Sequence, residues 1–485
     1  MSASVPRRPF VGALLAALWA IGTLRALLLC MHAPLYAYAN SYDETRYTTC
    51  FHFYPDRPAD VEPQQHSPEA PYAKFRFIQT RDPMCYWSSE LAFTGATALI
   101  WSAGGDTTHD VRWVAMLRWL VLLAISIALS RALLRRGEVR AAIANAALVP
   151  LVFADPGNTL YLSTFYAEWT ALIAAYALVA LVLLWRDASR SRARFAVLAL
   201  VAFLLATSKL QHMLLPLGLG LAVLVLDRWR LGHTSWRAAA LILGALAGVY
   251  FQFVQTTREG LMMDTIRQYN TADVVFTGIL PFADDPRALL EEVGIDPGCA
   301  IYTGKRAWQL PDLPDRACVG LVNFTRGREI GVLIRHPAIA AKLAVHGIPA
   351  LDPWIADNVG HVEGGQFQKL PASIPSVGHV LHASAMARYT LLLLPFLGLL
   401  ALLIRPGMRR GSGELHATTL VVVTMLGTLA VTLLGDGLAD TAKQGHLVVN
   451  AALAWLAVGL MMRVPGFRTT VRTAGLPESP TRLPR

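Results

Sequence analysis

The sequence predicts an all-α polytopic membrane protein with about ten transmembrane helices. Of the 485 residues, 54% are hydrophobic and only 16% are charged, and the mean hydropathy is +0.42, which is too apolar for a soluble chain of this length. The apolar residues also gather into runs that are long enough to cross a bilayer, which takes about 20 residues. The composition excludes a disordered chain, a collagen-like repeat, a coiled coil and a small disulfide-stapled fold.

The predicted spans are the long apolar runs, taken in chain order. They lie near residues 11–30, 112–134, 139–155, 165–185, 194–208, 210–226, 237–255, 388–404, 417–435 and 446–462. The run at 88–104 is apolar but shorter, and we expect it to form a helix that lies on the membrane.

Arginine clusters recur at every second connection between the predicted spans. Since basic residues are retained on the cytoplasmic side, both termini are expected to be cytoplasmic. Residues 31–110 and 256–387 then form two long outer loops, called the first and the second loop below. The clusters also account for the formal net charge of +10 without a nucleic-acid partner. They are Arg7 and Arg8; Arg131, Arg135, Arg136 and Arg140; Arg186, Arg190, Arg192 and Arg194; Arg228, Arg230 and Arg237; Arg405, Arg409 and Arg410; Arg463, Arg468 and Arg472.

This topology divides the chain into six parts. They are a cytoplasmic start with the first span (1–30), the first loop (31–110), spans two to seven (111–255), the second loop (256–387), spans eight to ten (388–463) and a cytoplasmic tail (464–485). A cleaved signal peptide is an alternative for the start, because Ala37-Tyr38-Ala39 resembles a peptidase site. We favour an uncleaved span, because the apolar run is long for a signal peptide.

Cysteine usage fits the predicted topology. Cys50 and Cys85 fall in the first loop, Cys299 and Cys318 fall in the second, and Cys30 ends the first span. Four outer cysteines permit three pairings, of which we favour the two short closures, Cys50 with Cys85 and Cys299 with Cys318. Reduced thiols are the alternative, and no spacing suggests zinc.

The second loop has the pattern of a folded helical subdomain. Asp284-Asp285-Pro286 has the cap and first-turn proline of a helix start, and RALLEEVGI follows. Two further amphipathic helices are predicted between Gly327 and His346, with a break at His336-Pro337.

The first loop carries the candidate catalytic residues. Asp43 and Glu44 are adjacent carboxylates about ten residues beyond the first span. Carboxylates in that position act as a general base, bind a metal, or only solvate a loop end, and all three readings fit the sequence.

Further polar residues stand where apolar ones are expected, and the topology places them on the outer side. Ionisable residues at membrane depth are candidates for function, with snorkelling or capping as the alternative. Arg25 and Arg118 lie within spans, and we expect them to pair with these acids or to bind lipid phosphate. The outer polar residues are Glu168, Lys209, Gln211, His212, Asp436, Asp440 and Lys443.

A series of short motifs resembles the WsfD-type glycan-biosynthesis hexose transferases of bacteria, which are membrane glycosyltransferases of the GT-C kind. The motifs follow one another in the family's order over most of the chain. They are the segment 40–46, NTLYLSTFYAEW (158–169), ATSKLQH (206–212), YNTADVVFTGILP (269–281), DDPRALLEEVGIDPGCAIYTGKRAW (284–308), REIGVLIRHP (328–337), LGDGLADTAK (434–443) and Asn450.

The resemblance implies a GT-C-like enzyme of the bacterial inner membrane with its active site on the periplasmic side. Its donor would be a polyprenyl-phosphate-linked hexose, and its acceptor a glycan or a lipid-linked saccharide. Asp43 or Glu44 would be the base, and Lys209 or Arg46 would neutralise the leaving phosphate. The sequence establishes no cofactor, and the paired carboxylates fit the binding of Mg²⁺ or Mn²⁺ no better than the role of a general base. The expected donor or acceptor contacts are Asn40, Tyr42, Arg46, Tyr166, Glu168, Lys209, Gln211, Tyr269, Asn270, Asp436, Asp440 and Lys443.

Two readings from other classes remain. One is a transporter or flippase of a lipid-linked saccharide, against which stand the lack of an internal repeat and the position of the polar residues at one face. The other is a non-catalytic membrane component of a glycan assembly system.

Overall fold

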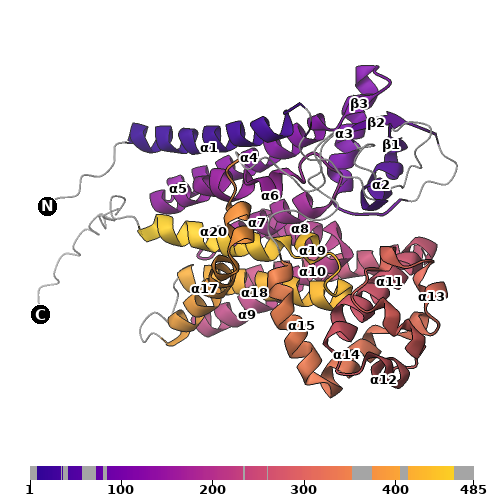
Figure 1. Cartoon of the computed structure of the whole chain (residues 1–485). Coiled ribbons are helices and arrows are strands. Elements are labelled where there is room, and N and C mark those ends of the chain that lie inside the picture. Colours follow the sequence, from indigo (N-terminus) through magenta and orange to yellow (C-terminus); the bar gives the residue numbers. More distant parts are fainter. Residues whose placement is uncertain are drawn as a thin grey trace, which may run out of the picture.

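The computed structural model describes residues 8–33, 35, 42–56, 73–79, 85–232, 235–258, 260–351, 374–404 and 413–463. Within these ranges a helix forms at each of the ten predicted spans (Figure 1). They are α1 (Arg8–Cys30), α4 (Arg112–Arg135), α5 (Val139–Leu148) with a π-helix (Val149–Phe153), α7 (Glu168–Leu184), α8 (Arg192–Ser208), α9 (Leu215–Leu231), α10 (Trp236–Arg258), α17 (Ala385–Ile404), α18 (Gly413–Asp436) and α20 (His446–Arg463).

Seven of these helices, counted over the described residues, are long and apolar enough to cross a membrane. They are α1, α4, α9, α10, α17, α18 and α20. The predicted number of about ten therefore exceeds the number that meets this criterion, because α5, α7 and α8 are shorter. The fold class is confirmed, since the chain is a helical polytopic membrane protein.

Small residues bring two spans into close contact. A Cβ at Gly244 of α10 would lie 2.1 Å from the carbonyl oxygen of Ala199, and one at Gly248 would lie 2.3 Å from Cβ of Ala206. Only glycine permits the backbones of α8 and α10 to approach this closely. The contact fixes the end of α8, from which Ser208 and Lys209 follow.

The first loop contains a small sheet that the sequence analysis did not predict. Its elements are α2 (Tyr42–Thr48), a 3₁₀ turn (Thr49–Phe51), β1 (Phe53–Pro55), β2 (Lys74–Phe77), the apolar helix α3 (Leu91–Gly104) and β3 (His109–Asp110). The strands are antiparallel in the order β1-β2-β3. Strands of three, four and two residues are too short to give a clear alternation of apolar and polar positions.

The second loop forms the predicted helical subdomain, with a hydrophobic core of its own. Asp285 caps α12 by accepting hydrogen bonds from the amides of Arg287 and Ala288, and the chain breaks between α14 and α15 at the predicted place. Its helices are α11 (Gly260–Asp273), a π-helix (Val274–Ile279), α12 (Pro286–Glu292), α13 (Pro314–Ala317), α14 (Arg326–Arg335), α15 (Pro337–Ala350) and α16 (Val377–Ala383), with 3₁₀ turns at 280–282, 297–302, 307–309 and 321–323.

The structure contains both favoured disulfides. Cys50 bonds to Cys85 and Cys299 bonds to Cys318. The first links the 3₁₀ turn after α2 to the segment that precedes α3, and the second closes a loop inside the core of the helical subdomain.

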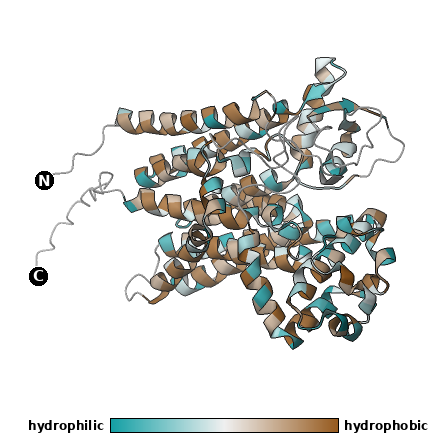
Figure 2. Ribbon diagram, in the orientation of Figure 1, coloured by the Kyte–Doolittle hydropathy of each residue, from teal (hydrophilic) through white to brown (hydrophobic). Residues whose placement is uncertain are grey.

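The two loops lie at the same end of the helix bundle, opposite the start of α1 and the end of α20 (Figure 1). Figure 2 shows that apolar residues dominate the bundle, whereas hydrophilic residues are frequent in the second loop. The end of the bundle that carries both loops is called the loop end below.

Candidate functional site

Glu168 and Lys209 form a buried ion pair at the loop end. Glu168 opens α7, Lys209 follows α8, and the distance from Lys209 Nζ to Glu168 Oε1 is 2.5 Å. Their side chains are 1% and 9% exposed, respectively. Two charges removed from water in this way are costly to keep unless they are paired. The pair therefore marks a place where the fold maintains charge in a buried setting.

A second lysine lies beside this pair, in the turn before the last span. Lys443 belongs to the short helix α19 (Thr441–Gln444), and its Nζ lies 2.6 Å from Asp440 Oδ2. The same ammonium group lies 5.2 Å from the ring centroid of Tyr166. His446 connects the two pairs, because its ring nitrogens lie 3.1 Å from the Lys443 carbonyl oxygen and 3.0 Å from the Glu168 carbonyl oxygen.

Gln211 joins the turn after α8 to α19. It lies in a 3₁₀ turn (Leu210–His212), and its Nε2 donates to the carbonyl oxygen of Gln444 over 3.2 Å. The Gln444 side chain donates to Asp436 Oδ2 over 3.3 Å. His212 completes the turn, with Nδ1 3.0 Å from Ser208 Oγ. The turn is therefore fixed to α8 on one side and to α18 and α19 on the other.

The second loop contributes Asp273 to the same region. Asp273 ends α11, is 2% exposed, and accepts a hydrogen bond of 2.7 Å from the Ala307 amide. Burial and the neighbouring charge of Asp436 raise the pKa of Asp273 well above its usual value. The end of α11 packs closely on the turn after α18 because residue 437 is a glycine. Gly437 has φ +59°, and a Cβ at this position would lie 2.6 Å from Thr277 Oγ1 and 2.7 Å from the Asp273 carbonyl oxygen.

The first loop places α2 against this cluster. Tyr47 of α2 belongs to one hydrophobic cluster with Tyr86 and Ala167, and Leu210 packs against it. Ala167 and Leu210 are the chain neighbours of Glu168 and Lys209, respectively. The apolar contacts therefore hold α2 next to the buried ion pair.

Two charged residues of α2 are themselves buried. Glu44 is 0% exposed and Arg46 is 9% exposed. The guanidinium carbon of Arg46 lies 5.4 Å from the ring centroids of both Tyr47 and Tyr86. Burial raises the pKa of the Tyr86 phenol, and the charge of Arg46 opposes this shift.

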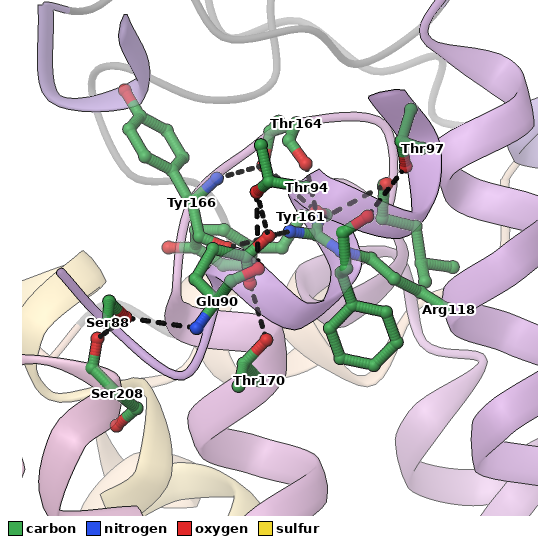
Figure 3. Close-up of polar contacts among 12 residues, drawn as sticks. Ser88, Glu90, Thr94, Thr97, Arg118, Tyr161, Thr164, Tyr166, Thr170 and Ser208 are labelled. Atoms are coloured by element: carbon green, nitrogen blue, oxygen red, sulfur yellow. Dashed lines mark hydrogen bonds and ion pairs between the residues drawn. The ribbon is translucent and has the colours of Figure 1, made fainter. Parts of the chain in front are cut away.

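A buried arginine supports the connector between α6 (Pro156–Thr159) and α7 (Figure 3). Arg118 of α4 and Glu90 form an ion pair in which both side chains are fully buried. Glu90 also accepts a hydrogen bond of 2.5 Å from Thr170 Oγ1. The guanidinium group of Arg118 donates to the carbonyl oxygens of Tyr161 (2.9 Å), Leu162 (3.4 Å), Thr164 and Tyr166 (3.2 Å).

The other side of this connector packs into the first loop. The Phe165 ring lies 5.1 Å from that of Phe53, 5.0 Å from that of Phe75 and 6.1 Å from that of Trp101, measured between centroids. Residues 160–167 are therefore held through the backbone by Arg118 and through Phe165 by the aromatic core. Tyr166 and Glu168 follow directly from this fixed segment.

The chain matches a known family of membrane domains. The model of the YfdI N-terminal transmembrane domain matches residues 7–343, which is most of the chain. The chain belongs to this family. The matched residues of this protein include Glu44, Glu168, Lys209 and Asp273, whereas α19 with Lys443 lies beyond the match. No curated protein and no solved structure matches the chain significantly.

The structure brings together seven of the predicted binding residues of this YfdI-type chain at the loop end. They are Tyr166, Glu168, Lys209, Gln211, Asp436, Asp440 and Lys443. Arg46 lies in the adjoining α2. Tyr166 joins the group through its cation–π contact with Lys443. The other six take part in the hydrogen bonds and ion pairs given above, which also involve His446 and Gln444.

Other predicted residues lie apart from the cluster or cannot be placed in it. Tyr269 packs against the core of the second loop, and both Tyr269 and Asn270 lie one turn before Asp273 in α11. Asn40 lies outside the described residues, as do the side chains of Tyr42 and Asp43, which begin α2.

The expected acidic partners of Arg25 and Arg118 were wrong. Arg25 pairs with Asp155 over 3.2 Å, and Arg118 pairs with Glu90. Both acids come from segments near the ends of helices, where they were not recognised as membrane-depth charges. Glu168 and Asp440 of the cluster are instead paired with Lys209 and Lys443, respectively.

Glu90, Asp273 and His446 lie in or beside the site but were not predicted from the sequence. Glu90 directly precedes a short apolar run, and His446 lies three residues after Lys443, directly before the last apolar run. Polar residues at the edges of apolar runs were thus the available signal. Among the described residues, no three His, Cys, Asp or Glu side chains gather in an arrangement suited to a metal ion.

Proposed function

We propose that the protein is an integral membrane glycosyltransferase. It transfers a hexose from a polyprenyl-phosphate-linked donor to a glycan or a lipid-linked saccharide, at the outer face of the bacterial inner membrane. The family is one of membrane domains, and the motif resemblance points to the WsfD-type hexose transferases within membrane glycosyltransferases. The observation that carries the proposal is the cluster of two buried lysines, each paired with a carboxylate, beside the buried charges of α2.

The lysines suit the phosphate of a lipid-linked donor. Lys209 and Lys443 both lie at the loop end, at the ends of apolar helices, which is the level where the phosphate of a lipid with its tail in the bilayer would lie. Transfer breaks the bond between the anomeric carbon and a phosphate oxygen, and the phosphate leaves with the electron pair. A buried ammonium group stabilises the developing charge strongly, because little water competes with it.

The carboxylates of α2 are suited to accept a proton from the acceptor hydroxyl group. As the acceptor hydroxyl oxygen bonds to the anomeric carbon, its proton passes to Asp43 or Glu44, which is the role of a general base. Glu44 is the better supported of the two, because its side chain is fully buried and α2 adjoins the lysine cluster. Arg46, stacked on Tyr47 and Tyr86, supplies a further positive charge at this end of the site.

The position of the charges favours a transferase over a transporter. A transporter is expected to hold its substrate site near the membrane midplane, between halves that alternate in access. Glu168, Lys209 and Lys443 instead lie at the ends of their helices. A non-catalytic scaffold would have no need of buried lysines next to buried carboxylates, since these are costly to maintain.

The test is transfer in vitro by the purified full-length protein in nanodiscs. Polyprenyl-phosphate hexoses are offered with lipid-linked saccharide acceptors, and products are identified by mass and linkage. Lys209→Met/Glu168→Gln is the inactive control. Release of free polyprenyl phosphate together with an acceptor heavier by one hexose supports the proposal. Movement of an intact lipid-linked saccharide between leaflets, without transfer, would instead support the transporter.

A further inference from the structure

The bent helix pair α14–α15 carries an exposed apolar face. Ile330 and Ile334 are 51% and 73% exposed, and Val345 is 58% exposed. Ala338 and Ala341 are exposed between them. The interval of four residues within α14, and the intervals of three and four within α15, keep these side chains on one face of each helix. These five residues are called the α14–α15 stripe below, and it lies opposite the positions through which the two helices are buried.

Both helices of the pair contact α18 at its loop end. At the start of α14, the guanidinium group of Arg326 donates to the carbonyl oxygens of Leu434 and Gly435 in α18, the latter over 2.9 Å. Near the end of α15, Gly347 packs so closely on Leu433 that a Cβ would lie 2.8 Å from its side chain. The bend between the two helices therefore projects sideways from α18. Figure 1 shows α15 crossing the direction of the spans.

The stripe is continuous with a surface that faces lipid. Arg388 near the start of α17 donates to the carbonyl oxygen of Pro349 over 3.0 Å, which joins α15 to that span. Met386, Leu393 and Leu397 of α17 are 79%, 49% and 58% exposed. In a helix that crosses the membrane, such side chains are solvated by lipid tails. The apolar surface of α17 thus leads directly to the end of α15.

Basic residues flank the stripe. Arg335 lies 2.8 Å from Glu292, and Lys342 lies 3.4 Å from Asp284, yet the two basic side chains remain 55% and 48% exposed. Apolar residues along one face with basic residues at its edges are typical of helices that lie in the headgroup region of a bilayer.

We propose that the α14–α15 stripe rests on the bilayer at the loop end, with Ile334 and Val345 inserted below the lipid headgroups. The second loop is then fixed to the membrane at two places, the end of α18 and the bend of α14–α15. This attachment holds the second loop, and Asp273 within it, at a constant height above the bilayer. The inference does not depend on the reaction that the protein catalyses.

The experiment uses spin labels on the full-length protein in nanodiscs of phosphatidylethanolamine and phosphatidylglycerol. Single cysteines at Ile334 and Val345 are labelled in a Cys30→Ser background with both disulfides intact. Val319 and Val322, which are 70% and 53% exposed in the same subdomain, provide matched control sites. We expect the labels at Ile334 and Val345 to collide more with oxygen than with a water-soluble nickel complex, and the control labels to show the reverse.

Two outcomes would overturn the proposal. Labels at Ile334 and Val345 as accessible to nickel as those at the control sites would place the stripe in water. Labels shielded from both reagents would mean that protein covers it. An independent measurement on the unmodified protein uses a photoactivatable carbene in the lipid tails. It should label residues 330–345 and leave 318–325 unlabelled, and the opposite pattern would reject the proposal.

Discussion

Lys209 Nζ lies 2.5 Å from Glu168 Oε1, and neither side chain is more than 9% exposed. Removing one partner of such a pair leaves a buried charge without compensation, which costs about 3–5 kcal/mol. We therefore expect Lys209→Met alone to lower expression, and Lys209→Met/Glu168→Gln to restore it. If the pair binds the donor phosphate, the double variant folds but does not transfer hexose, as measured by activity per folded molecule.

A second buried pair provides the control for this experiment. Arg237 and Asp227 lie 2.5 Å apart and are 1% and 0% exposed, and they join the end of α9 to the start of α10, away from the loop end. Arg237→Met/Asp227→Asn should retain activity per folded molecule. Equal loss of activity per folded molecule in both double variants would show that removal of either buried pair disturbs the helix packing, and would contradict donor binding by Lys209 and Glu168.

Glu44→Gln preserves the volume of the side chain and removes its charge, and Asp43→Asn does the same one position earlier. Loss of a general base typically lowers the rate 10²–10⁴-fold, a rough general range. We expect that loss in at least one of the two variants, with normal expression in both. Asp56→Asn is the matched change in the same loop, where the carboxylate pairs with Arg76 near the surface. It should behave as wild type, and normal activity in all three would exclude a base in α2.

Arg118→Lys keeps a positive charge beside Glu90 but cannot reach the several carbonyl oxygens to which the guanidinium group donates. Residues 160–167 should then be held less firmly, which displaces Tyr166 and Glu168. We predict a lower kcat together with a lower unfolding temperature. Arg112→Lys, in the same helix and paired with Asp110, is the comparison. A lower unfolding temperature with unchanged kcat would restrict Arg118 to a structural role.

Asp273 gives the protein a pH-dependent stability of a specific sign. Its pKa is raised in the folded state, so the folded protein binds this proton more tightly than the unfolded chain does. The stabilising contribution is full below the unfolded value of 3.8 and is lost as the pH rises through the raised folded pKa.

Asp273→Asn tests this linkage, because the amide oxygen can still accept the hydrogen bond from Ala307. The variant should unfold at a higher temperature than wild type at pH 8, and the difference should shrink towards pH 5. A constant difference across this range would show that Asp273 does not titrate in it.

The positions of the spans could be predicted from the sequence, because a helix that crosses a bilayer requires a long apolar run, and α4, α10 and α18 have such runs. The sequence was also sufficient for much of the cluster, since Lys209 and Glu168 are conspicuous charges at the edges of such runs. The Glu90–Arg118 pair could not be predicted from the sequence, because Glu90 directly precedes α3 whereas Arg118 lies within α4. Only tertiary packing brings the two side chains together. The burial of Asp273 beside Asp436 could not be predicted for the same reason, because the two residues are far apart in the sequence.

Phe165 belongs to the connector that presents Tyr166 and Glu168, yet among the described residues its ring contacts aromatic side chains of the first loop, namely Phe53, Phe75 and Trp101. If the protein is the proposed transferase, an attempt to change its choice of acceptor by grafting the first loop of another family member would therefore also disturb residues outside the graft. The graft would replace Phe53, Phe75 and Trp101, whereas Phe165 would remain from the original chain. Residue 165 would therefore also need to be changed, so that its side chain packs against the grafted residues. A loop exchanged without its matching connector residue would lose activity on every acceptor, including its own.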